Sequence, residues 1–467
     1  MIYKGYEPVI GLELHVELRT EKKAFCDCSA SFGGEVNTKC CPVCLGKGGR
    51  PVFNSEAHER GIAAAIALGC RVSETSYFDR KHYVAVDLPK GYQITQYYEP
   101  LARNGRICAC VDGREVTLTV ERIQLEEDAG RTVRRGDVET VDFNRCGVPL
   151  IEIITAPEIR SGAEAEAVLE EIRRYLLFAG VSDCKMNEGS LRCDVNVSVR
   201  PVGSDAFGNR CEIKNIGSVS GVGRAIAYET ERQTELILSG GTVTVETRRF
   251  DEKSGVTVRM RDKETASDYG YIREDELPPL LTDADTVERV RHSMPVSYAD
   301  RRDALLMKGV SEQNVSVILT SPESADYFED AVSHGADAAC AANLFVSEIY
   351  PAWEKRPTPD AFAECVSMYT AGEVTVMSAR QLIKLSSESG QPPRRIADER
   401  GMLVIKDAHV IENLVREATE ALPRAVEDVK SGKSAAKKVL VGYVMKKSRG
   451  RAEPSAVNAA VDKFFEE

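Results

Sequence analysis

Residues 9–18 have the sequence Val9-Ile-Gly-Leu-Glu-Leu-His-Val-Glu-Leu18. From position 12 onward every second side chain is aliphatic, and the positions between are polar: Glu13, His15 and Glu17. Because successive side chains of a β-strand point to opposite faces, this alternation predicts a strand with one apolar face and one face carrying carboxylates and an imidazole. A strand with one solvated face has the same pattern, so this interpretation stays open until other segments are considered.

Two further segments carry carboxylates in a strand context. Residues 123–130 end an alternating run with three consecutive acids: Glu126, Glu127 and Asp128. Adjacent carboxylates repel one another, which is tolerable in water or around a divalent cation, and a solvated loop remains the alternative. Glu152 lies between aliphatic neighbours, and burying it is costly unless it is paired or ligates a metal. An imidazole with several carboxylates suits Mg²⁺ or Mn²⁺ better than a closed zinc site, although the sequence does not show that the three segments converge.

Four cysteines form two short clusters, Cys26-Asp-Cys28 and Cys41-Pro-Val-Cys44, separated by twelve residues. Zinc prefers four thiolates in a tetrahedron, and such clusters each deliver two ligands from one turn. The sequence therefore predicts a structural zinc site made of Cys26, Cys28, Cys41 and Cys44, with Cys40 as a spare. Reduced structural thiols and a redox pair are the alternatives.

Composition limits the class of protein. A chain of 467 residues with 43% hydrophobic and 29% charged residues is typical of a globular protein with about two to four domains. It contains no apolar run of about 18 residues and begins without an apolar leader, so we expect a cytoplasmic protein without a membrane partner. In a reducing compartment the fourteen cysteines are expected as thiols or metal ligands.

The elements suggest an α+β fold in three parts. Up to about residue 290, strand patterns and Gly-rich turns mix with helices at 164–179 and 225–239 and a hairpin at 242–260. Helical periodicity then dominates, in 287–292, 322–335, 336–349 and 361–369, and a Lys-rich helical stretch begins near 409. We predict a mixed α/β domain at 1–292, a helical domain at 293–405 and a helical tail at 406–467.

The tail reverses the charge of the chain, whose formal net charge is −12. That acidity argues against a protein that coats nucleic acid, but it does not exclude RNA held by one basic patch. Eight Lys and Arg residues occur between Lys430 and Arg451 without a single acid. This pattern favours contact with RNA phosphates, and a solvated helix face is the alternative.

Some motifs are missing. No Gly-x-x-x-x-Gly-Lys-Ser/Thr loop is present, so any ATP chemistry is not of the P-loop kind. The chain also lacks a Gly-x-Ser-x-Gly elbow and the Gly/Ser-rich segment of amidases. We expect no glutamine hydrolysis by this chain.

Long motifs throughout the chain resemble the B subunit of aspartyl/glutamyl-tRNA amidotransferases. They include residues 9–18, Asp87-Leu-Pro-Lys-Gly-Tyr-Gln-Ile94, Leu125-Glu-Glu-Asp-Ala-Gly130, 141–152, Glu188-Gly-Ser-Leu-Arg-Cys-Asp-Val-Asn196 and Val441-Gly-Tyr-Val-Met-Lys446. The resemblance implies a cradle-shaped catalytic domain, an all-α helical domain and a small helical tail that meets the tRNA. It also implies a heterotrimer with an amidase (A) subunit and a small C subunit.

The resemblance implies a reaction as well. ATP phosphorylates the side-chain carboxyl of Glu-tRNA(Gln) or Asp-tRNA(Asn), and ammonia from the amidase subunit then displaces the phosphate. By family position the Mg²⁺ and ATP residues are Glu13, His15, Glu126 or Glu127, and Glu152. The four cysteines match the zinc-containing form of the family, and the tRNA contacts are expected at Lys437, Lys438, Lys446 and Lys447.

Several segments depart from the family pattern. Ala85-Val86 replaces a Tyr-Pro pair, Ile216-Gly-Ser-Val219 replaces Leu-Asn-Ser-Phe, and residues 269–275 replace Tyr-Arg-Tyr-Phe-Pro-Glu-Pro. A non-catalytic paralogue that binds tRNA or a partner and keeps the zinc fold and the tail is therefore the alternative function.

Overall fold

The computed structural model describes residues 2–135, 138–262, 269–431, 433, 435–448 and 450–466. The chain divides into two compact units, residues 1–298 and 299–467. All the named strands lie in the first unit and the second is helical, so the predicted α+β fold class is confirmed. The predicted boundaries at residues 292 and 405 stay predictions.

A nine-stranded sheet forms the frame of the first unit. Its neighbours are antiparallel except for one parallel pair, β12 with β13. In spatial order the strands are β14 (Val256–Asp262), β13 (Glu246–Asp251), β12 (Cys211–Lys214), β11 (Leu191–Pro201), β1 (Tyr6–Glu17), β10 (Pro149–Thr155), β7 (Arg114–Glu127), β6 (Ala102–Val111) and β2 (Arg71–Val72). The segment at residues 9–18 thus belongs to a central strand, and β13 and β14 form the predicted hairpin.

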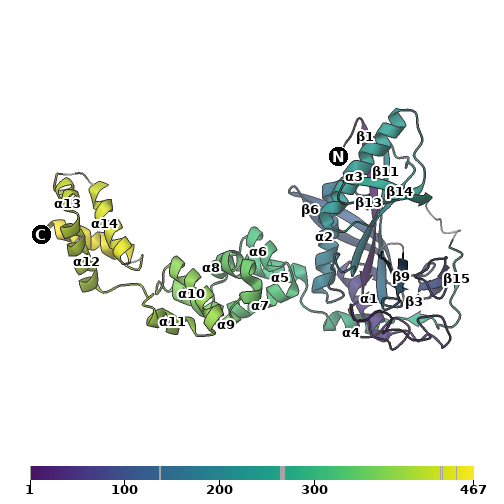
Figure 1. Ribbon diagram of the computed structural model, residues 1–467, viewed down its shortest axis with the longest axis horizontal. Helices are drawn as coiled ribbons and strands as arrows, with labels where there is room; N and C mark the ends of the chain where they lie inside the picture. Colours follow the sequence, from purple (N-terminus) through teal and green to yellow (C-terminus); the bar gives the residue numbers. More distant parts are fainter. Residues whose placement is uncertain are drawn as a thin grey trace. The chain divides into compact units, whose positions relative to one another are not determined.

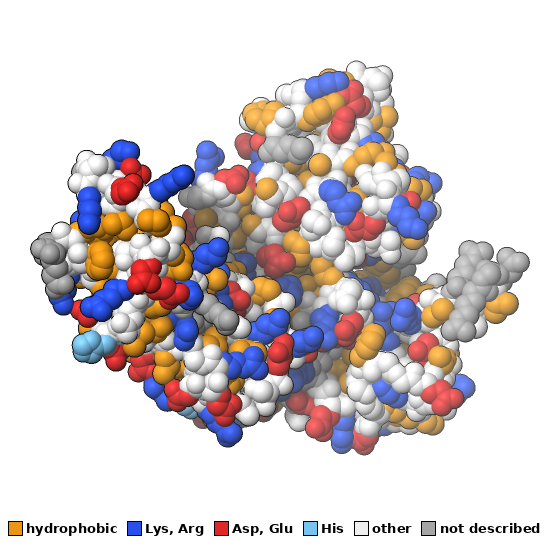
Figure 2. Space-filling model, turned by 60° about the vertical axis from the view of Figure 1, so that its left-hand side comes forward, with side chains coloured by type: hydrophobic (Ala, Val, Ile, Leu, Met, Phe, Trp, Pro, Cys, Tyr) orange, Lys and Arg blue, Asp and Glu red, His pale blue; other side chains and the backbone are white. Residues whose placement is uncertain are grey.

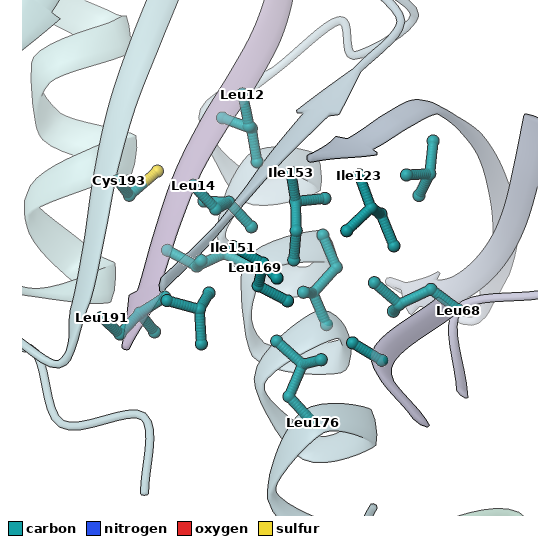
Figure 3. Close-up of a cluster of buried hydrophobic side chains, with 14 of the residues drawn as sticks. Leu12, Leu14, Leu68, Ile123, Ile151, Ile153, Leu169, Leu176, Leu191 and Cys193 are labelled. Atoms are coloured by element: carbon teal, nitrogen blue, oxygen red, sulfur yellow. The ribbon is translucent and has the colours of Figure 1, made fainter. Parts of the chain in front are cut away.

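Three helices cover the apolar face of this sheet: α1 (Ser55–Ala67), α2 (Gly162–Phe178) and α3 (Val219–Leu238) (Figure 1). Figure 3 shows Leu12, Leu14, Ile151 and Ile153 of the central strands packed with Leu169 and Leu176 of α2. Each such side chain contributes about 1.5–3 kcal/mol when it leaves water. The predicted alternation in residues 9–18 therefore fixes which face becomes the core.

Helix α3 begins six residues before its predicted start. Ser218 caps it by accepting a hydrogen bond from the amide of Gly221 at 3.0 Å, so Gly221 and Gly223 lie inside the helix. Gly162 and Gly223 have a packing role, because a Cβ on Gly162 would lie 2.8 Å from the carbonyl oxygen of Gly223. These glycines allow α2 and α3 to approach closely.

The other face of the large sheet is polar and is partly covered by a small sheet. This second sheet contains β15 (Ile272–Arg273), β4 (Asp79–His82) and β5 (Tyr92–Thr95). It joins β7 through side chains, for example the hydrogen bond that Gln124 Nε2 donates to Thr95 Oγ1 at 3.3 Å. Two short ladders complete the unit: β16 (Leu280–Leu281) with β3 (Thr75–Ser76), and β8 (Arg131–Arg135) with β9 (Val138–Asp142).

The second unit confirms the predicted helical periodicity. Its named helices include α5 (Tyr298–Met307), α6 (Glu312–Ile318), α7 (Pro322–Ser333), α8 (Ala338–Leu344), α9 (Pro359–Thr370), α10 (Val376–Ser389) and α11 (Pro393–Glu399). The tail contains α12 (Ala408–Ala421), α13 (Pro423–Lys430), α14 (Ala435–Lys447) and α15 (Pro454–Glu466), around a small core that includes Ile411, Leu440 and Val457. Among the described residues no helix is long and apolar enough to cross a membrane.

Candidate functional site

Strands β1 and β10 bring three of the predicted residues together on the polar face. His15 lies directly opposite Glu152 in the antiparallel ladder, and Glu13 lies opposite Ile154. One donor atom from each of Glu13, His15 and Glu152 lies within 4.8 Å of the other two. The carboxylates and imidazole predicted from separate segments therefore form one cluster, which we call the acid cluster.

Glu126 joins this cluster and Glu127 does not. Strand β7 pairs with β10 and places Glu126 on the same face as Gln124, whose partner across the ladder is Glu152. Gln93 Nε2 donates a hydrogen bond to Glu126 Oε1 at 3.1 Å, while Glu126 Oε2 is buried without a hydrogen-bond partner among the described residues.

Glu127 points to the opposite side of β7. There it forms an ion pair with Lys90, whose side chain is only 7% exposed, and accepts a hydrogen bond from the amide of Ile94 at 2.8 Å. Asp128, the third acid of the triplet, forms ion pairs with Arg192 at 2.6 Å and Arg145 at 3.5 Å. Three consecutive acids thus have three different environments.

The carboxylates of the acid cluster lie close together and repel one another. Burial raises the pKa of Glu152 well above its ordinary value, and the neighbouring charges of Glu13 and Glu126 raise it further. Burial likewise raises the pKa of Glu126, against the opposing charge of Lys81. A bound divalent cation would relieve this repulsion, because it favours the ionised form of each carboxylate.

His15 is held neutral beside these acids. Burial, followed by the charge of Arg192, lowers the pKa of His15 to about 3. Burial, followed by the charge of Asp128, raises the pKa of Glu17 on the same strand face to about 8. A neutral imidazole keeps a lone pair available, so His15 fits a metal-ligand role at physiological pH.

Several residues of the site were not singled out from the sequence. Lys81 of β4 faces Glu126 and Glu152, and Arg192 of β11 lies opposite His15 in the ladder. A second group of carboxylates, Glu13, Asp194 and Glu212, also has donor atoms within 4.8 Å of one another. The signal for β11 was present, because polar residues 192, 194 and 196 alternate with apolar 193, 195 and 197.

The carboxylate of Glu212 is held from both sides. Lys214 lies 3.4 Å from Oε1, and Thr247 Oγ1 of β13 donates a hydrogen bond to Oε2 at 2.9 Å. Lys214 also forms an ion pair with Asp194. These contacts fix the second carboxylate group before any ligand binds.

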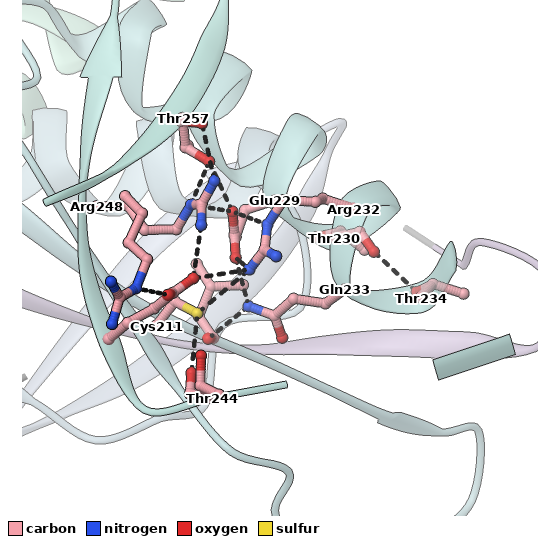
Figure 4. A network of polar contacts seen from close by, with 12 residues as sticks. Cys211, Glu229, Thr230, Arg232, Gln233, Thr234, Thr244, Arg248 and Thr257 are labelled. Atoms are coloured by element: carbon pink, nitrogen blue, oxygen red, sulfur yellow. Dashed lines mark hydrogen bonds and ion pairs between the residues drawn. The ribbon is translucent and has the colours of Figure 1, made fainter. Parts of the chain in front are cut away.

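A buried polar network supports strands β12 to β14 behind this group (Figure 4). Glu229 of α3 is fully buried and accepts hydrogen bonds from Gln233 Nε2 at 2.8 Å and Thr257 Oγ1 at 2.9 Å. Burial opposes ionisation of Glu229, but these bonds and the Arg232 guanidinium lower its pKa below the ordinary value. Arg248 forms an ion pair with Glu246 beside them.

The four predicted zinc ligands converge in the loop between β1 and α1. One sulfur from each of Cys26, Cys28, Cys41 and Cys44 lies within 4.8 Å of the other three, and Cys41 and Cys44 are 4.0 Å apart. Zinc with four thiolates at about 2.3 Å places sulfurs about 3.8 Å apart, so the group fits this metal. Cys40 is outside the group, with its sulfur 3.9 Å from Asn144 Oδ1. The cysteine cluster could therefore bind a metal such as zinc.

A buried lysine accompanies the thiols. Lys23 is fully buried, donates a hydrogen bond to the carbonyl oxygen of Lys39 at 2.7 Å and places its Nζ 3.9 Å from Cys44 Sγ. Four thiolates around a divalent zinc leave a net charge of −2, and the ammonium group lies where it offsets part of that charge.

The tail lysines are exposed or half-exposed on α14. Lys437 forms an ion pair with Asp462, and Lys447 forms one with Glu417 at 2.6 Å. Lys438 and Lys446 have no ion pair within the part of the tail that the structure describes. Figure 2 shows Lys and Arg side chains interspersed with Asp and Glu on the face drawn, instead of one field of a single charge.

The sheet with an acidic centre on its polar face, followed by a helical unit, defines a large α+β protein with a helical C-terminal part. The chain belongs to the GatB/GatE family, that of the aspartyl/glutamyl-tRNA amidotransferase B subunits, because two family models match it. Residues 8–288 match the GatB/GatE catalytic domain and residues 326–464 match the GatB domain.

Curated relatives agree over nearly the whole chain. The B subunit of the aspartyl/glutamyl-tRNA(Asn/Gln) amidotransferase of Moorella thermoacetica is 44% identical over 97% of this chain and 98% of its own length. Proteins of the same name from Geobacillus kaustophilus and Caldicellulosiruptor saccharolyticus are 43% and 42% identical over the same shares. The resemblance noted in the sequence is therefore confirmed, and the chain is classed with ligases of protein biosynthesis.

Proposed function

We propose that this chain is the subunit of a tRNA-dependent amidotransferase that activates the charged tRNA. In this proposal ATP phosphorylates the side-chain carboxyl of Glu-tRNA(Gln) or Asp-tRNA(Asn), and ammonia then displaces the phosphate to give the amide. The convergence of Glu13, His15, Glu126 and Glu152 on one polar face carries the proposal. The names of the relatives support the substrate class.

The proposed phosphoryl transfer explains why a face with several carboxylates is needed. A carboxylate is a poor electrophile, and phosphorylation gives it a good leaving group. Phosphoryl transfer depends mainly on positioning and on neutralising charge, so the protein needs no nucleophile of its own. Mg²⁺ held by Glu13, His15 and Glu152 would neutralise phosphate oxygens, and the group of Glu13, Asp194 and Glu212 offers a second position.

The chain's own cations complete the proposed site. Lys81 and Arg192 lie beside the acids without being metal ligands, so they are suited to orient anionic substrates. Glu126 has one carboxylate oxygen without a partner among the described residues and a raised pKa, which suits a group that exchanges a proton with the incoming ammonia. The sequence named Glu126 or Glu127 as a Mg²⁺ and ATP residue; because Glu127 is paired with Lys90, we propose Glu126 for that role as well.

Other parts of the assembly must supply the ammonia. The sequence contains no glutaminase motif, so we propose an amidase subunit and a small C subunit as partners in a cytoplasmic heterotrimer. We propose that Cys26, Cys28, Cys41 and Cys44 hold a structural zinc ion, and that Lys437, Lys438, Lys446 and Lys447 contact tRNA phosphates.

The decisive experiment uses the chain with high ammonium in place of its partners. We expect ATP-dependent conversion of charged tRNA by the native chain. His15→Ala and Glu152→Gln should abolish the ATP hydrolysis that charged tRNA stimulates, while tRNA affinity stays nearly unchanged. Full activity in Glu152→Gln would show a merely structural acid. Binding of charged tRNA without any conversion by the native chain would favour the non-catalytic paralogue, which the altered segments near residues 85, 217 and 270–275 otherwise suggest.

A further inference from the structure

One lysine of the first unit is completely buried without an acidic partner. Lys23 has an exposed fraction of 0% and is one of the largest fully buried side chains of the protein. Within the residues that the structure describes it forms no ion pair with a carboxylate, whereas the buried Lys90 pairs with Glu127. Burying an ammonium group is costly unless an opposite charge lies close to it. The charge of Lys23 therefore needs another source of compensation.

Two carbonyl groups and one sulfur surround this ammonium group. Lys23 Nζ donates a hydrogen bond to the carbonyl oxygen of Lys39 at 2.7 Å. It lies 3.5 Å from the carbonyl oxygen of Phe143 and 3.9 Å from Cys44 Sγ. These three acceptors match the three N–H groups of an ammonium. Carbonyl groups carry no net charge, so Cys44 is the one of these three neighbours that can supply a negative charge.

The charge of the cysteine group depends on whether it holds a metal. Four neutral thiols carry no charge and would leave the ammonium group of Lys23 uncompensated. A metal ion binds the thiolate form, and four thiolates around a divalent zinc ion carry a net charge of −2. The surroundings of Lys23 therefore fit the metal-bound group better than four reduced thiols.

A second negative charge lies close to the cysteine group. A Cβ added to Gly147 would lie 3.4 Å from Cys44 Cβ and 3.8 Å from Glu127 Oε2. The same Cβ would lie 3.5 Å from Lys23 Cδ. A dianionic metal group and a buried carboxylate repel one another across so short a gap. Lys23 reduces this repulsion on the thiolate side, and Lys90 reduces it on the side of Glu127.

We propose that Lys23 is the counter-ion of the zinc–tetrathiolate group and that its charge sets the affinity of the four cysteines for zinc. Lys23 acts through the thiolates without being a ligand, and its contacts with the carbonyl groups of Lys39 and Phe143 hold it in position. This inference rests on the proposed zinc ion and adds the residue that makes a buried dianion tolerable. It requires that the effect of Lys23 on zinc binding follows the charge of the ligand set.

The first experiment measures the zinc affinity of the full chain by competition with a chromogenic chelator. Lys23→Met should weaken zinc binding about tenfold or more, because removing a partner of a metal ligand typically costs about 10–100-fold in affinity. The matched control is Lys22→Met, since Lys22 is 58% exposed and pairs with Asp27 on the surface. This control should leave the affinity within about twofold of the native value. Native affinity in Lys23→Met overturns the proposal.

A spectroscopic measurement shows whether the ligands stay in place. Cobalt(II) bound to the native chain, to Lys23→Met and to Lys22→Met should give the same tetrahedral tetrathiolate absorption spectrum. An unchanged spectrum with a weakened affinity supports an effect of charge on a site whose four sulfurs still converge. A Lys23→Met spectrum that has lost the tetrathiolate bands would show that Lys23 builds the site sterically, and it overturns the proposal.

The second experiment separates charge from packing by changing the ligand set. Cys28→His replaces a half-buried thiolate by a neutral imidazole, so the net charge of the zinc group changes from −2 to −1. Coulomb energy scales with charge, so in this background Lys23→Met should weaken zinc binding only about threefold where it costs tenfold in the native chain. Cys41→His, at another half-buried ligand, repeats the comparison.

Each result of this comparison has a definite meaning. The same loss of affinity in the native and His-substituted backgrounds would show that Lys23 only supports the packing of the loop, and it overturns the proposal. A native chain that binds neither zinc nor cobalt contradicts the proposed zinc site itself, and the inference about Lys23 falls with it.

Discussion

Glu126 and Glu127 show how far two adjacent identical residues can differ. The side chain of Glu126 lies near Glu152 and Lys81. The side chain of Glu127 is neutralised by Lys90 in an ion pair that is almost completely buried. Breaking a buried pair costs far more than a surface pair, because it leaves one charge uncompensated. At Glu126, in contrast, burial and repulsion from neighbouring carboxylates make the ionised side chain unfavourable for folding.

These environments predict opposite effects of mutation. Lys90→Met should lower the free energy of unfolding by about 3 kcal/mol, since it leaves the Glu127 carboxylate buried without a cation. Glu126→Gln should change stability by less than about 1 kcal/mol but reduce kcat about 100-fold. Urea unfolding, monitored by circular dichroism, measures the effect on stability. Ammonium-dependent conversion of charged tRNA measures the effect on kcat. A stable Lys90→Met variant, or a fully active Glu126→Gln, would contradict this division of roles.

At the scale of elements, helix α1 and the start of α4 (Ala284–Ser293) are joined by a buried histidine. His58 Nε2 lies 2.8 Å from Thr282 Oγ1, and the imidazole is 9% exposed. Burial lowers the pKa of His58 to about 4, with Glu59 raising it and Arg289 lowering it slightly. The neutral imidazole is therefore part of the folded contact.

This pKa predicts a pH dependence of stability. As the pH falls below about 6.5, the unfolded chain binds a proton at His58 before the folded chain does, so stability is lost between pH 6.5 and about 4. At pH 5.5 this one group should cost about 1 kcal/mol relative to pH 7.5. His58→Asn should lose less stability than the native chain over that range. Circular dichroism is the suitable signal, because Trp353 lies in the second unit. Identical pH profiles would rule out a contribution from His58.

The loop with the four cysteines is the element that depends most on a ligand. Metal binding energy at such a site is folding energy, so Cys41→Ser or Cys44→Ser should lose zinc and thermal stability together. Cys40→Ser is the matched control, since its sulfur lies outside the group and should leave both quantities unchanged. Metal analysis and Tm measure the outcome. Absence of zinc from native protein prepared without chelator would refute the assignment.

At the scale of the whole molecule, the proposed chemistry and the proposed tRNA grip lie in different units. The acid cluster belongs to residues 1–298 and α14 to residues 299–467. A lysine that already forms an ion pair gains less free energy from contact with a phosphate than an unpaired lysine does, because the existing ion pair must first be broken. The four tail lysines therefore divide into two matched pairs.

Two double variants compare these pairs. Lys438→Gln/Lys446→Gln should reduce the slope of tRNA affinity against salt by about two units, and Lys437→Gln/Lys447→Gln should reduce it by less. Conversion at saturating charged tRNA should survive in both, since neither pair lies near the acid cluster in sequence. If both double variants titrate like the native chain, α14 is a solvated face and the tRNA is held elsewhere.

The sequence by itself determined the local features of this protein. Alternation in residues 9–18 decided which face of β1 is apolar, and short spacings of the four cysteines decided that each pair lies on one turn. Helical periodicity likewise located α7, α8 and α9 of the second unit, although the glycines near residue 222 hid the start of α3. These features follow from backbone periodicity, which acts over a few residues.

Only the tertiary structure decided which of these features meet. The register that sets His15 against Glu152, and the small sheet that brings Lys81 and Gln93 to Glu126, depend on packing between segments far apart in the chain. A strand pattern states the face of each side chain but not its neighbour across the ladder. Neighbours are chosen by burying the apolar face against α1, α2 and α3, and that choice gathers the acids on the opposite face.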